Sequence, residues 1–132
     1  MMSVKDCRYY YLIGGRWSGK TWGVIDIATV EQAQNKELRI AACRKVYGSI
    51  KNSLYDDWIK IINSRYGFKK GVHYDSTVSP LYLKYSNGSD VIFKGMDDPE
   101  KTKGLSQCHW AIMEELNEFS EMDFETIDNG LR

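Results

Sequence analysis

The sequence of 132 residues has no excess of charge of either sign, because 18 lysine and arginine residues balance 18 aspartate and glutamate residues. This balance gives no reason to expect constitutive binding to nucleic acid or to a membrane, so any DNA contact has to be local or transient. No apolar run approaches the roughly 20 residues of a membrane-spanning helix. No signal-peptide pattern opens the chain either. These absences disfavour an integral membrane protein and a broadly basic nucleic-acid-binding protein.

Cysteine is scarce as well, and the three that occur, Cys7, Cys43 and Cys108, are far apart and odd in number. They form no metal-ligand spacing and indicate a reducing compartment, with each thiol buried or half-buried. Internal repeats and low-complexity segments are lacking too. With 42% hydrophobic and 27% charged residues, the composition is that of a globular protein, and the length suffices for one domain with a core.

A glycine-rich stretch, GGRWSGKT at residues 14–21, fits the pattern G-x-x-x-x-G-K-[ST] at every fixed position. Glycines let several backbone N–H groups approach phosphate oxygens, and a following helix directs its partial positive charge at the same oxygens. We expect Lys20 to reach the β- and γ-phosphates and the Thr21 hydroxyl to bind Mg²⁺. The whole loop is predicted to contact ATP, through Gly14, Gly15, Arg16, Trp17, Ser18, Gly19, Lys20 and Thr21.

The residues on both sides of this loop favour the same interpretation. Residues 8–13, RYYYLI, are aromatic and apolar, as in a buried strand. The polar run beyond Glu31 indicates the end of a helix that follows the loop. Within that helix, four residues follow helical spacing and so share one face, namely Trp22, Ile25, Ala28 and Gln32. Strand, loop and helix in this order are the context that a phosphate loop needs. The alternative is a glycine turn that binds no ligand.

A second strand and a second helix follow. Residues 39–43, RIAAC, predict a strand that ends at Arg44. Residues 48–67 predict a helix with Ser49 as its N-cap and Gly67 as its stop. One face of this helix is apolar, at Ile50, Leu54, Trp58, Ile61 and Ile62.

The pattern then changes to alternation around Asn87-Gly88, which predicts a β-hairpin over residues 81–95 with φ above zero at both turn residues. Leu81, Leu83 and Tyr85 are expected to share one face, as are Val91 and Phe93. Further on, Pro99 predicts a short helix capped by Asp98, and residues 121–132 look helical without a clear end. Together these elements predict an α/β fold with helices on both faces of the sheet.

A phosphate loop needs an acidic partner at the end of a neighbouring strand. Residues 109–113 have the character of a buried strand that leads into Glu114 and Glu115. Ligands bind outside the carboxyl ends of strands in open α/β sheets, so we assign Glu114 to the metal and Glu115 to orienting and deprotonating the attacking water. Aspartate is the commoner metal-side residue, so the assignment can slip by one position. The alternative is an acidic helix start favoured by the helix dipole.

At this point the chain resembles the N-terminal ATPase domain of tailed-phage terminase large subunits, the motors that package DNA. The resemblance is carried by five segments in order, RYYYLIGGRWSGKT, RIAACRKVYGSIKNSLYDDW, LKYSNGSDVIFKG, MDDPEKTKGL and AIMEELNEF. It implies a three-layer, RecA-like P-loop NTPase fold with a mainly parallel sheet plus a hairpin, and an extra strand between the loop strand and the metal strand. It also implies that residues 1–132 are a single, partial ATPase domain, truncated at the C-terminus, without the nuclease domain.

The resemblance extends to residues, partners and location. It implies that Arg16 senses the γ-phosphate or couples hydrolysis to motion, and that a neighbouring subunit supplies a basic finger, for which Lys103 is the candidate. The alternative for both residues is a solvated side chain. Implied partners are double-stranded DNA, other large subunits in a ring, the small terminase subunit and the portal protein, in the host bacterial cytoplasm. For Arg44 and Lys45, on the ligand face, a nucleotide or DNA contact stays open.

Two other functions remain open on the sequence. One is another P-loop ATPase, such as a helicase-like protein. The other is a truncated nucleotide-binding interaction module without turnover. No nuclease activity is expected, because no acidic triad for two metals is recognisable. The principal expectation is therefore an ATPase that uses ATP and Mg²⁺, with Lys20, Glu115, Arg16 and Lys103 as catalytic candidates and Thr21 and Glu114 at the metal.

Overall fold

The protein is described here by a computed structural model that covers residues 9–13, 18–98 and 100–131. Within these ranges six strands form one sheet in the order β1-β6-β2-β5-β4-β3. The strands are β1 (Tyr9–Ile13), β2 (Arg39–Arg44), β3 (Tyr74–Val78), β4 (Leu81–Tyr85), β5 (Asp90–Gly95) and β6 (Trp110–Glu114). β1, β6, β2 and β5 run parallel, whereas β4 is antiparallel to β5 and β3 is antiparallel to β4. The sheet is therefore mixed, with the predicted hairpin strands as part of it.

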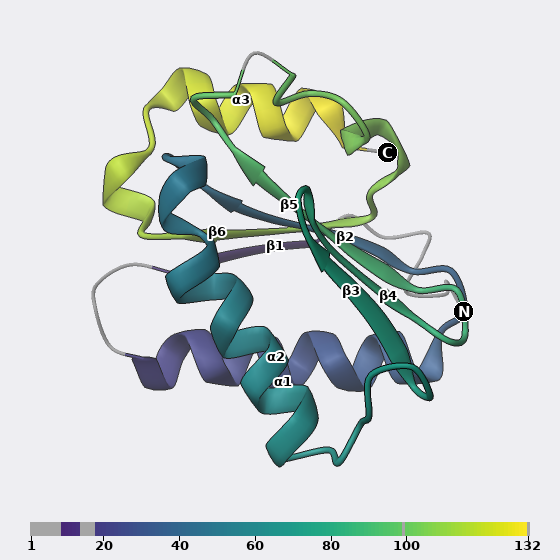
Figure 1. Ribbon diagram of the computed structural model, residues 1–132. Coiled ribbons are helices and arrows are strands. Elements are labelled where there is room, and N and C mark those ends of the chain that lie inside the picture. The colour runs from purple at the N-terminus through teal and green to yellow at the C-terminus, as the bar shows by residue number, and fades with distance from the viewer. Residues whose placement is uncertain (1–8, 14–17, 99, 132) are drawn as a thin grey trace.

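Helices cover both faces of this sheet (Figure 1). α1 (Ser18–Gln34) and α2 (Asp56–Ser64) lie on one face, and α3 (Glu121–Gly130) lies on the other. This three-layer arrangement confirms the expected α/β architecture. Within the described ranges, no helix combines the length and the apolar character that a membrane span requires.

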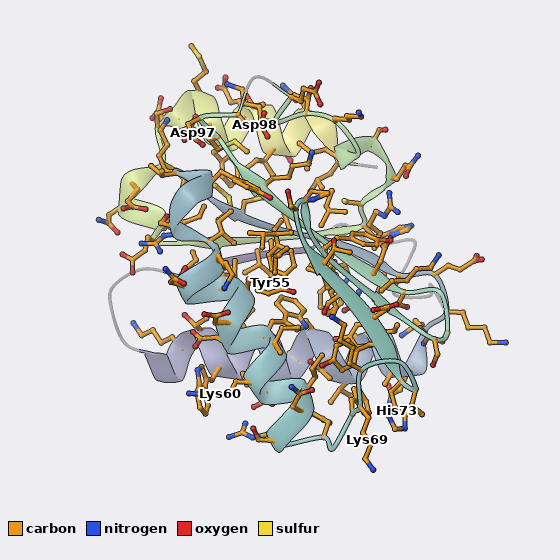
Figure 2. The ribbon with its side chains drawn as sticks, viewed as in Figure 1. Tyr55, Lys60, Lys69, His73, Asp97 and Asp98 are labelled. Atoms are coloured by element: carbon orange, nitrogen blue, oxygen red, sulfur yellow. The ribbon has the colours of Figure 1, made fainter. Side chains whose placement is uncertain are left out.

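Each face of the sheet has its own hydrophobic core. Under α1 and α2, Tyr55 points toward the sheet and its ring meets Phe93 edge-on, with centroids 5.2 Å apart (Figure 2). The predicted apolar face of residues 48–67 is confirmed, since it is buried at Ile50, Leu54, Trp58, Ile61 and Ile62. The hairpin residues Leu81, Leu83, Tyr85, Val91 and Phe93 are buried in the same core. Under α3 lies a smaller core that includes Leu105, Met113 and Ile127.

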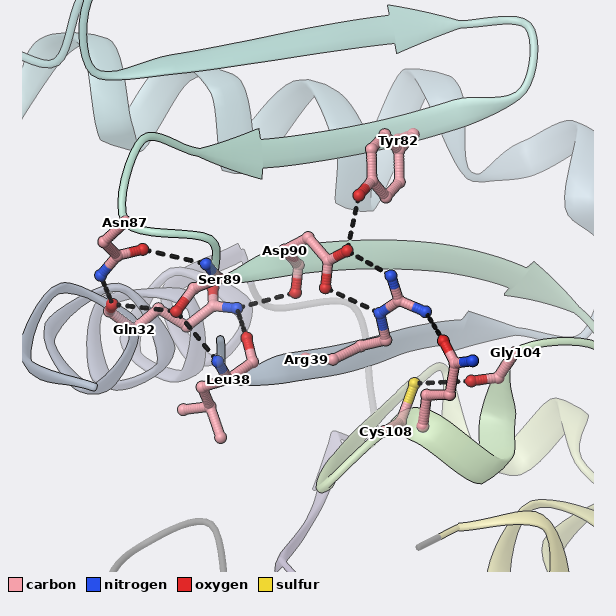
Figure 3. Close-up of polar contacts among 10 residues, drawn as sticks. Gln32, Leu38, Arg39, Tyr82, Asn87, Ser89, Asp90, Gly104 and Cys108 are labelled. Carbon is pink, nitrogen blue, oxygen red and sulfur yellow. Dashed lines mark hydrogen bonds and ion pairs between the residues drawn. The ribbon is translucent and has the colours of Figure 1, made fainter. Parts of the chain in front are cut away.

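A polar network fixes the amino-terminal end of β2 and β5 (Figure 3). The Asp90 carboxylate accepts from Arg39 Nε at 2.8 Å and Nη2 at 2.6 Å, and from the Tyr82 hydroxyl at 2.5 Å. Gln32, at the end of α1, donates to the carbonyl oxygens of Leu38 and Asp90. Arg39 donates two N–H groups to the two carboxylate oxygens of Asp90. Because such a bidentate pair has a defined geometry, it fixes this end of the sheet.

Local backbone geometry corrects two predictions about single residues. In the hairpin turn only Gly88 has positive φ (92°), whereas Asn87 does not. The Gly88 N–H donates to the Tyr85 carbonyl, so the turn is a longer one with a single left-handed residue. Ser49 is not a helix N-cap, because its hydroxyl donates to the Val46 carbonyl.

The helix predicted at residues 48–67 is also interrupted. A 3₁₀ turn at Tyr47–Ser49 and a π-helical turn at Lys51–Tyr55 precede α2, which ends at Ser64, three residues before Gly67. Residues 100–104 form hydrogen-bonded turns rather than the short helix predicted near Pro99, which itself lies outside the described residues. Asp98 still accepts from the Glu100 N–H at 2.9 Å, as a capping residue does.

The extra strand expected between the loop strand and the metal strand is not found among the described residues. β1 pairs directly with β6 in parallel, with Tyr9 opposite Trp110 and Ile13 opposite Glu114. The other described strands all lie beyond β6, so the β1 backbone finds its hydrogen-bond partners on β6. The resemblance was wrong on this point for the chain as described. The end of β1 therefore adjoins Glu114.

Candidate nucleotide site

The candidate site lies at the carboxyl ends of three adjacent parallel strands. β1 ends at Ile13 opposite Glu114, and the last β2–β6 pair joins Cys43 to Met113, one residue before Arg44 and Glu114. α1 begins at Ser18, five residues after Ile13, where β1 ends. The predicted sequence of strand, loop and helix therefore adjoins the strand end that carries Glu114. This is the edge at which open α/β sheets bind ligands.

A buried hydrogen bond joins the two predicted halves of the site. Thr21 Oγ1 donates to Glu114 Oε2 at 3.0 Å. Thr21 is 5% exposed and Glu114 is 6% exposed, although 93 positions separate them in the sequence. The structure thus brings together the two residues that the sequence assigned to one metal.

The Glu114 carboxylate is buried and only partly compensated. Burial raises its pKa, while the Thr21 hydrogen bond and the Arg44 charge oppose that rise. Arg44 Nη1 lies 3.9 Å from Glu114 Oε1, and that oxygen makes no hydrogen bond to the described residues. A buried carboxylate oxygen without a donor is costly, so the arrangement suits a ligand that supplies positive charge.

A hydroxyl and a carboxylate are oxygen ligands of the kind that Mg²⁺ prefers, so Thr21 and Glu114 fit this ion. No group of three or more His, Cys, Asp or Glu side chains suited to a metal occurs in the described part of the chain. Mg²⁺ sites commonly use one or two protein carboxylates and take their other ligands from phosphate and water.

Glu115 has a different environment from Glu114. It has left-handed backbone angles, with φ and ψ both 58°, and begins a 3₁₀ turn at Leu116–Glu118. Its carbonyl accepts from the Glu118 N–H at 2.8 Å. Non-glycine residues in this region are strained by roughly 1–3 kcal/mol and cluster at functional sites. The chain therefore leaves the sheet abruptly at the residue assigned to the attacking water.

Only some of the other predicted site residues lie within the described part of the chain. Gly14, Gly15, Arg16 and Trp17 lie outside the described residues, and Ser18 and Gly19 open α1. Lys20, on the first turn of α1, is exposed.

Lys103 pairs with Glu100 rather than with Glu114. Its side chain is 78% exposed and its ammonium lies 3.7 Å from Glu100. It lines a cavity of about 320 Å³ together with Tyr47 and Tyr82.

Arg44 is the residue whose role the sequence did not reveal. It was placed on the ligand face, but the structure shows that it lies between two carboxylates, Glu114 and Glu118. Its neighbour Lys45 is paired with Asp123 of the α3 capping box at 2.6 Å. The position of Arg44 after a buried strand was the available signal, whereas its partners depend on strand order.

The fold and this geometry define an α/β protein in which a strand–loop–helix unit meets a strand-end carboxylate. A comparison with protein families identifies it further, since the profile described as "Phage terminase large subunit" matches residues 7–132. The chain belongs to the phage terminase large subunit family.

Individual relatives agree with this membership. The PBSX phage terminase large subunit of Bacillus subtilis (strain 168) is 29% identical over 124 residues, which are 94% of this chain and 28% of the relative. The large terminase of the thermophilic bacteriophage D6E has the same fold, with a TM-score of 0.71 at 13% identity, over 96% of this chain and 32% of that one. A structure of the D6E protein in complex with ADP gives a TM-score of 0.65 at 14% identity, over 96% and 31% of the two chains. This chain therefore spans about a third or less of the relatives it matches.

Proposed function

We propose that this chain binds Mg·ATP at residues 14–21 and hydrolyses it, as the ATPase part of a terminase motor that translocates double-stranded DNA. The observation that carries the proposal is the buried hydrogen bond between Thr21 and Glu114. It joins a phosphate-loop threonine to a strand-end carboxylate, which is the pairing that a Mg·nucleotide site uses. The ADP complex of the D6E large terminase supports the same choice of ligand.

Each residue of the site has one task in this proposal. The backbone of residues 14–19 cradles the phosphates, and Lys20 neutralises charge on the β- and γ-phosphates. Thr21 and Glu114 hold Mg²⁺, which supplies further charge neutralisation there. Arg16 contacts the γ-phosphate.

Glu115 is the base in the hydrolytic step. It orients a water and takes its proton while the water oxygen attacks the γ-phosphorus and the bond to the β-phosphate oxygen breaks. Its position immediately after Glu114, in a turn that leaves the sheet, supports this division between the two carboxylates.

Residues 1–132 are proposed to form part of one ATPase domain. In the whole motor, this domain works in a ring of large subunits, with the small terminase subunit and the portal protein as partners, in the host bacterial cytoplasm. DNA contact is transient, since the 18 basic and 18 acidic residues cancel. Lys103 is proposed as the finger that a neighbouring subunit offers, which its exposure permits.

Isothermal calorimetry with Mg·ATP tests the nucleotide site directly. The wild-type chain is expected to bind, and Lys20→Ala is expected to abolish binding, because charge neutralisation at the β- and γ-phosphates is lost. Lys36→Ala removes an exposed lysine beyond the far end of α1 and serves as the control. An absence of binding by folded wild type, or equal binding by Lys20→Ala, would refute the proposed site.

A further inference from the structure

Arg44 occupies the end of β2 at the candidate site and is largely buried, with its side chain 17% exposed. Its Nη1 donates to Ser53 Oγ at 3.0 Å and to the Ser49 carbonyl at 3.4 Å. The same Nη1 lies 3.9 Å from Glu114 Oε1, and Nε lies 3.5 Å from Glu118 Oε1. One guanidinium is thus shared between the carboxylate assigned to the metal and a carboxylate four residues further on.

These two carboxylates flank Glu115 in the sequence, and a short turn connects them. The turn is closed by the Glu118 N–H, which donates to the Glu115 carbonyl at 2.8 Å, and by the Phe119 N–H, which donates to the Leu116 carbonyl at 3.1 Å. Attraction between Arg44 and the Glu118 side chain therefore also restrains the backbone turn that positions Glu115.

Arg44 is held less tightly than the arginine at the other end of the same strand. Arg39 grips Asp90 through two short bonds, at 2.8 and 2.6 Å. By contrast, Arg44 Nε and Glu114 Oε1 are both buried without a hydrogen-bond partner among the described residues. Apart from its bonds to Ser53 and Ser49, the Arg44 guanidinium has only carboxylate partners at 3.5 and 3.9 Å and an unsatisfied N–H. It can therefore shift between these two carboxylates at smaller cost than the paired fork of Arg39 can leave Asp90.

We propose that Arg44 is a positioning residue that couples metal occupancy at Glu114 to the turn carrying Glu115. This inference rests on the proposed function, because it needs a cation at Glu114. When Glu114 is engaged by a cation, the like charge of Arg44 is repelled and Glu118 remains as its anionic partner. Arg44 then interacts more closely with Glu118, and the turn at Glu115–Phe119 becomes more ordered. The site thereby orders its water-activating carboxylate only when the metal is in place.

Amide hydrogen exchange at Glu118 and Phe119 measures this coupling without any need for turnover. In the wild-type chain, ADP with Mg²⁺ is expected to slow exchange of these two amides by about tenfold relative to ADP with a chelator, which is an ordinary size for coupling between sites. Arg44→Gln and Glu118→Gln are each expected to abolish this difference. Arg39→Gln breaks an ion pair at the opposite end of β2 and is expected to retain it.

The outcomes separate the inference from the proposed function. Failure of the folded wild type to bind Mg·ADP in calorimetry refutes the proposed function and this inference with it. Binding with full Mg²⁺-dependent protection in Arg44→Gln refutes the inference alone and leaves the nucleotide site intact. Should Arg44→Gln fail to fold, Glu118→Gln decides the matter, because the Glu118 side chain is 38% exposed and Glu114 remains beside Arg44 when Glu118 is replaced. If Glu118→Gln keeps the Mg²⁺-dependent protection of these amides, the inference about Arg44 is likewise refuted.

Discussion

Glu114 and Glu115 are adjacent in the sequence, yet their surroundings suit them to different tasks. Glu114 is buried, accepts from Thr21 at 3.0 Å and lies 3.9 Å from Arg44. Glu115 is half-buried and sits at a left-handed position where the chain leaves the sheet. A metal ligand benefits from a fixed, desolvated carboxylate, whereas a general base needs access to water. The environments therefore favour Glu114 at the metal and Glu115 at the water.

Glutamine substitutions test this division. Glu115→Gln is expected to keep Mg·nucleotide affinity and to lower single-turnover hydrolysis by about 10²–10⁴-fold, because the base is lost while the metal ligands remain. Glu114→Gln is expected to shift the Mg²⁺ titration of nucleotide binding to higher concentration. Glu121→Gln, on the exposed first turn of α3, is the control. The opposite pattern would exchange the two roles.

The thiols of two buried cysteines are expected to be unreactive in the folded chain. Cys43 and Cys108 are both buried, and burial raises the pKa of the Cys43 thiol to about 12 and raises that of Cys108 as well. Since the thiolate is the nucleophile, neither residue should alkylate in the folded chain from pH 7 to 9, and both should react in denaturant. Peptide mass spectrometry after iodoacetamide treatment reports each site separately. Rapid labelling of Cys43 in the folded chain would contradict this packing.

At the scale of elements, Gly95 marks a close approach between the backbone of β5 and the backbone of the turn after β2. A Cβ at Gly95, the last residue of β5, would lie 2.5 Å from the backbone nitrogen of Tyr47. Tyr47 opens the 3₁₀ turn that follows Arg44 and Lys45, so the close approach helps to fix the end of β2. In contrast, a Cβ at Gly23 in α1 would meet no atom within 4 Å.

Alanine at these two glycines should therefore act in opposite directions. Gly95→Ala is expected to destabilise the fold by about 1–3 kcal/mol, because the backbone of Tyr47 must move. Gly23→Ala is expected to stabilise it by about 0.5–1 kcal/mol, because helical alanine loses less backbone entropy than glycine. Urea denaturation followed by circular dichroism measures both free energies of unfolding. Equal effects of the same sign would contradict the packing at Gly95.

The elements that sequence patterns predicted are those whose own residues determine their burial. β2 and β6 are continuous apolar runs, and the helical spacing from Ile50 to Ile62 marks the buried face correctly. β3 was missed because most of its residues are exposed and its conformation depends on pairing with β4 at the sheet edge. The π-helical turn before α2 likewise follows from tertiary packing rather than from a residue pattern.

The candidate site, like the fold, was predictable only in part from the sequence. The Thr21–Glu114 contact was foreseeable, because a loop after one parallel strand and a carboxylate after another share one edge of the sheet. The partners of Arg44 were not, because they depend on β2 lying beside β6 and on the left-handed turn at Glu115. Sequence periodicity carries neither strand order nor an isolated backbone angle.

At the scale of the whole molecule, the carboxyl ends of the parallel strands form one edge of the sheet, and this chain matches only part of the length of its relatives. It covers 28% of the PBSX large subunit and 32% of the D6E chain. Phosphoryl transfer depends on positioning and on charge around the transferred group. In other nucleotide hydrolases, an arginine finger contributes on the order of 10³–10⁵ in rate. The candidate Lys103 is exposed, and within its own chain its ammonium pairs with Glu100.

We therefore expect the 132-residue chain to be a very slow ATPase that does not move DNA. In the proposed function the chain itself supplies the phosphate cradle and the metal ligands, but an isolated monomer receives no charge from a neighbour at the transition state. Steady-state phosphate release across a protein concentration series, with and without duplex DNA, tests this, and Lys20→Ala sets the background. Specific activity that rises with protein concentration and falls in Lys103→Ala supports a finger donated between copies. Turnover of several per second (roughly the ordinary range for such enzymes), independent of concentration, would show that the chain needs no neighbour and would contradict the expectation.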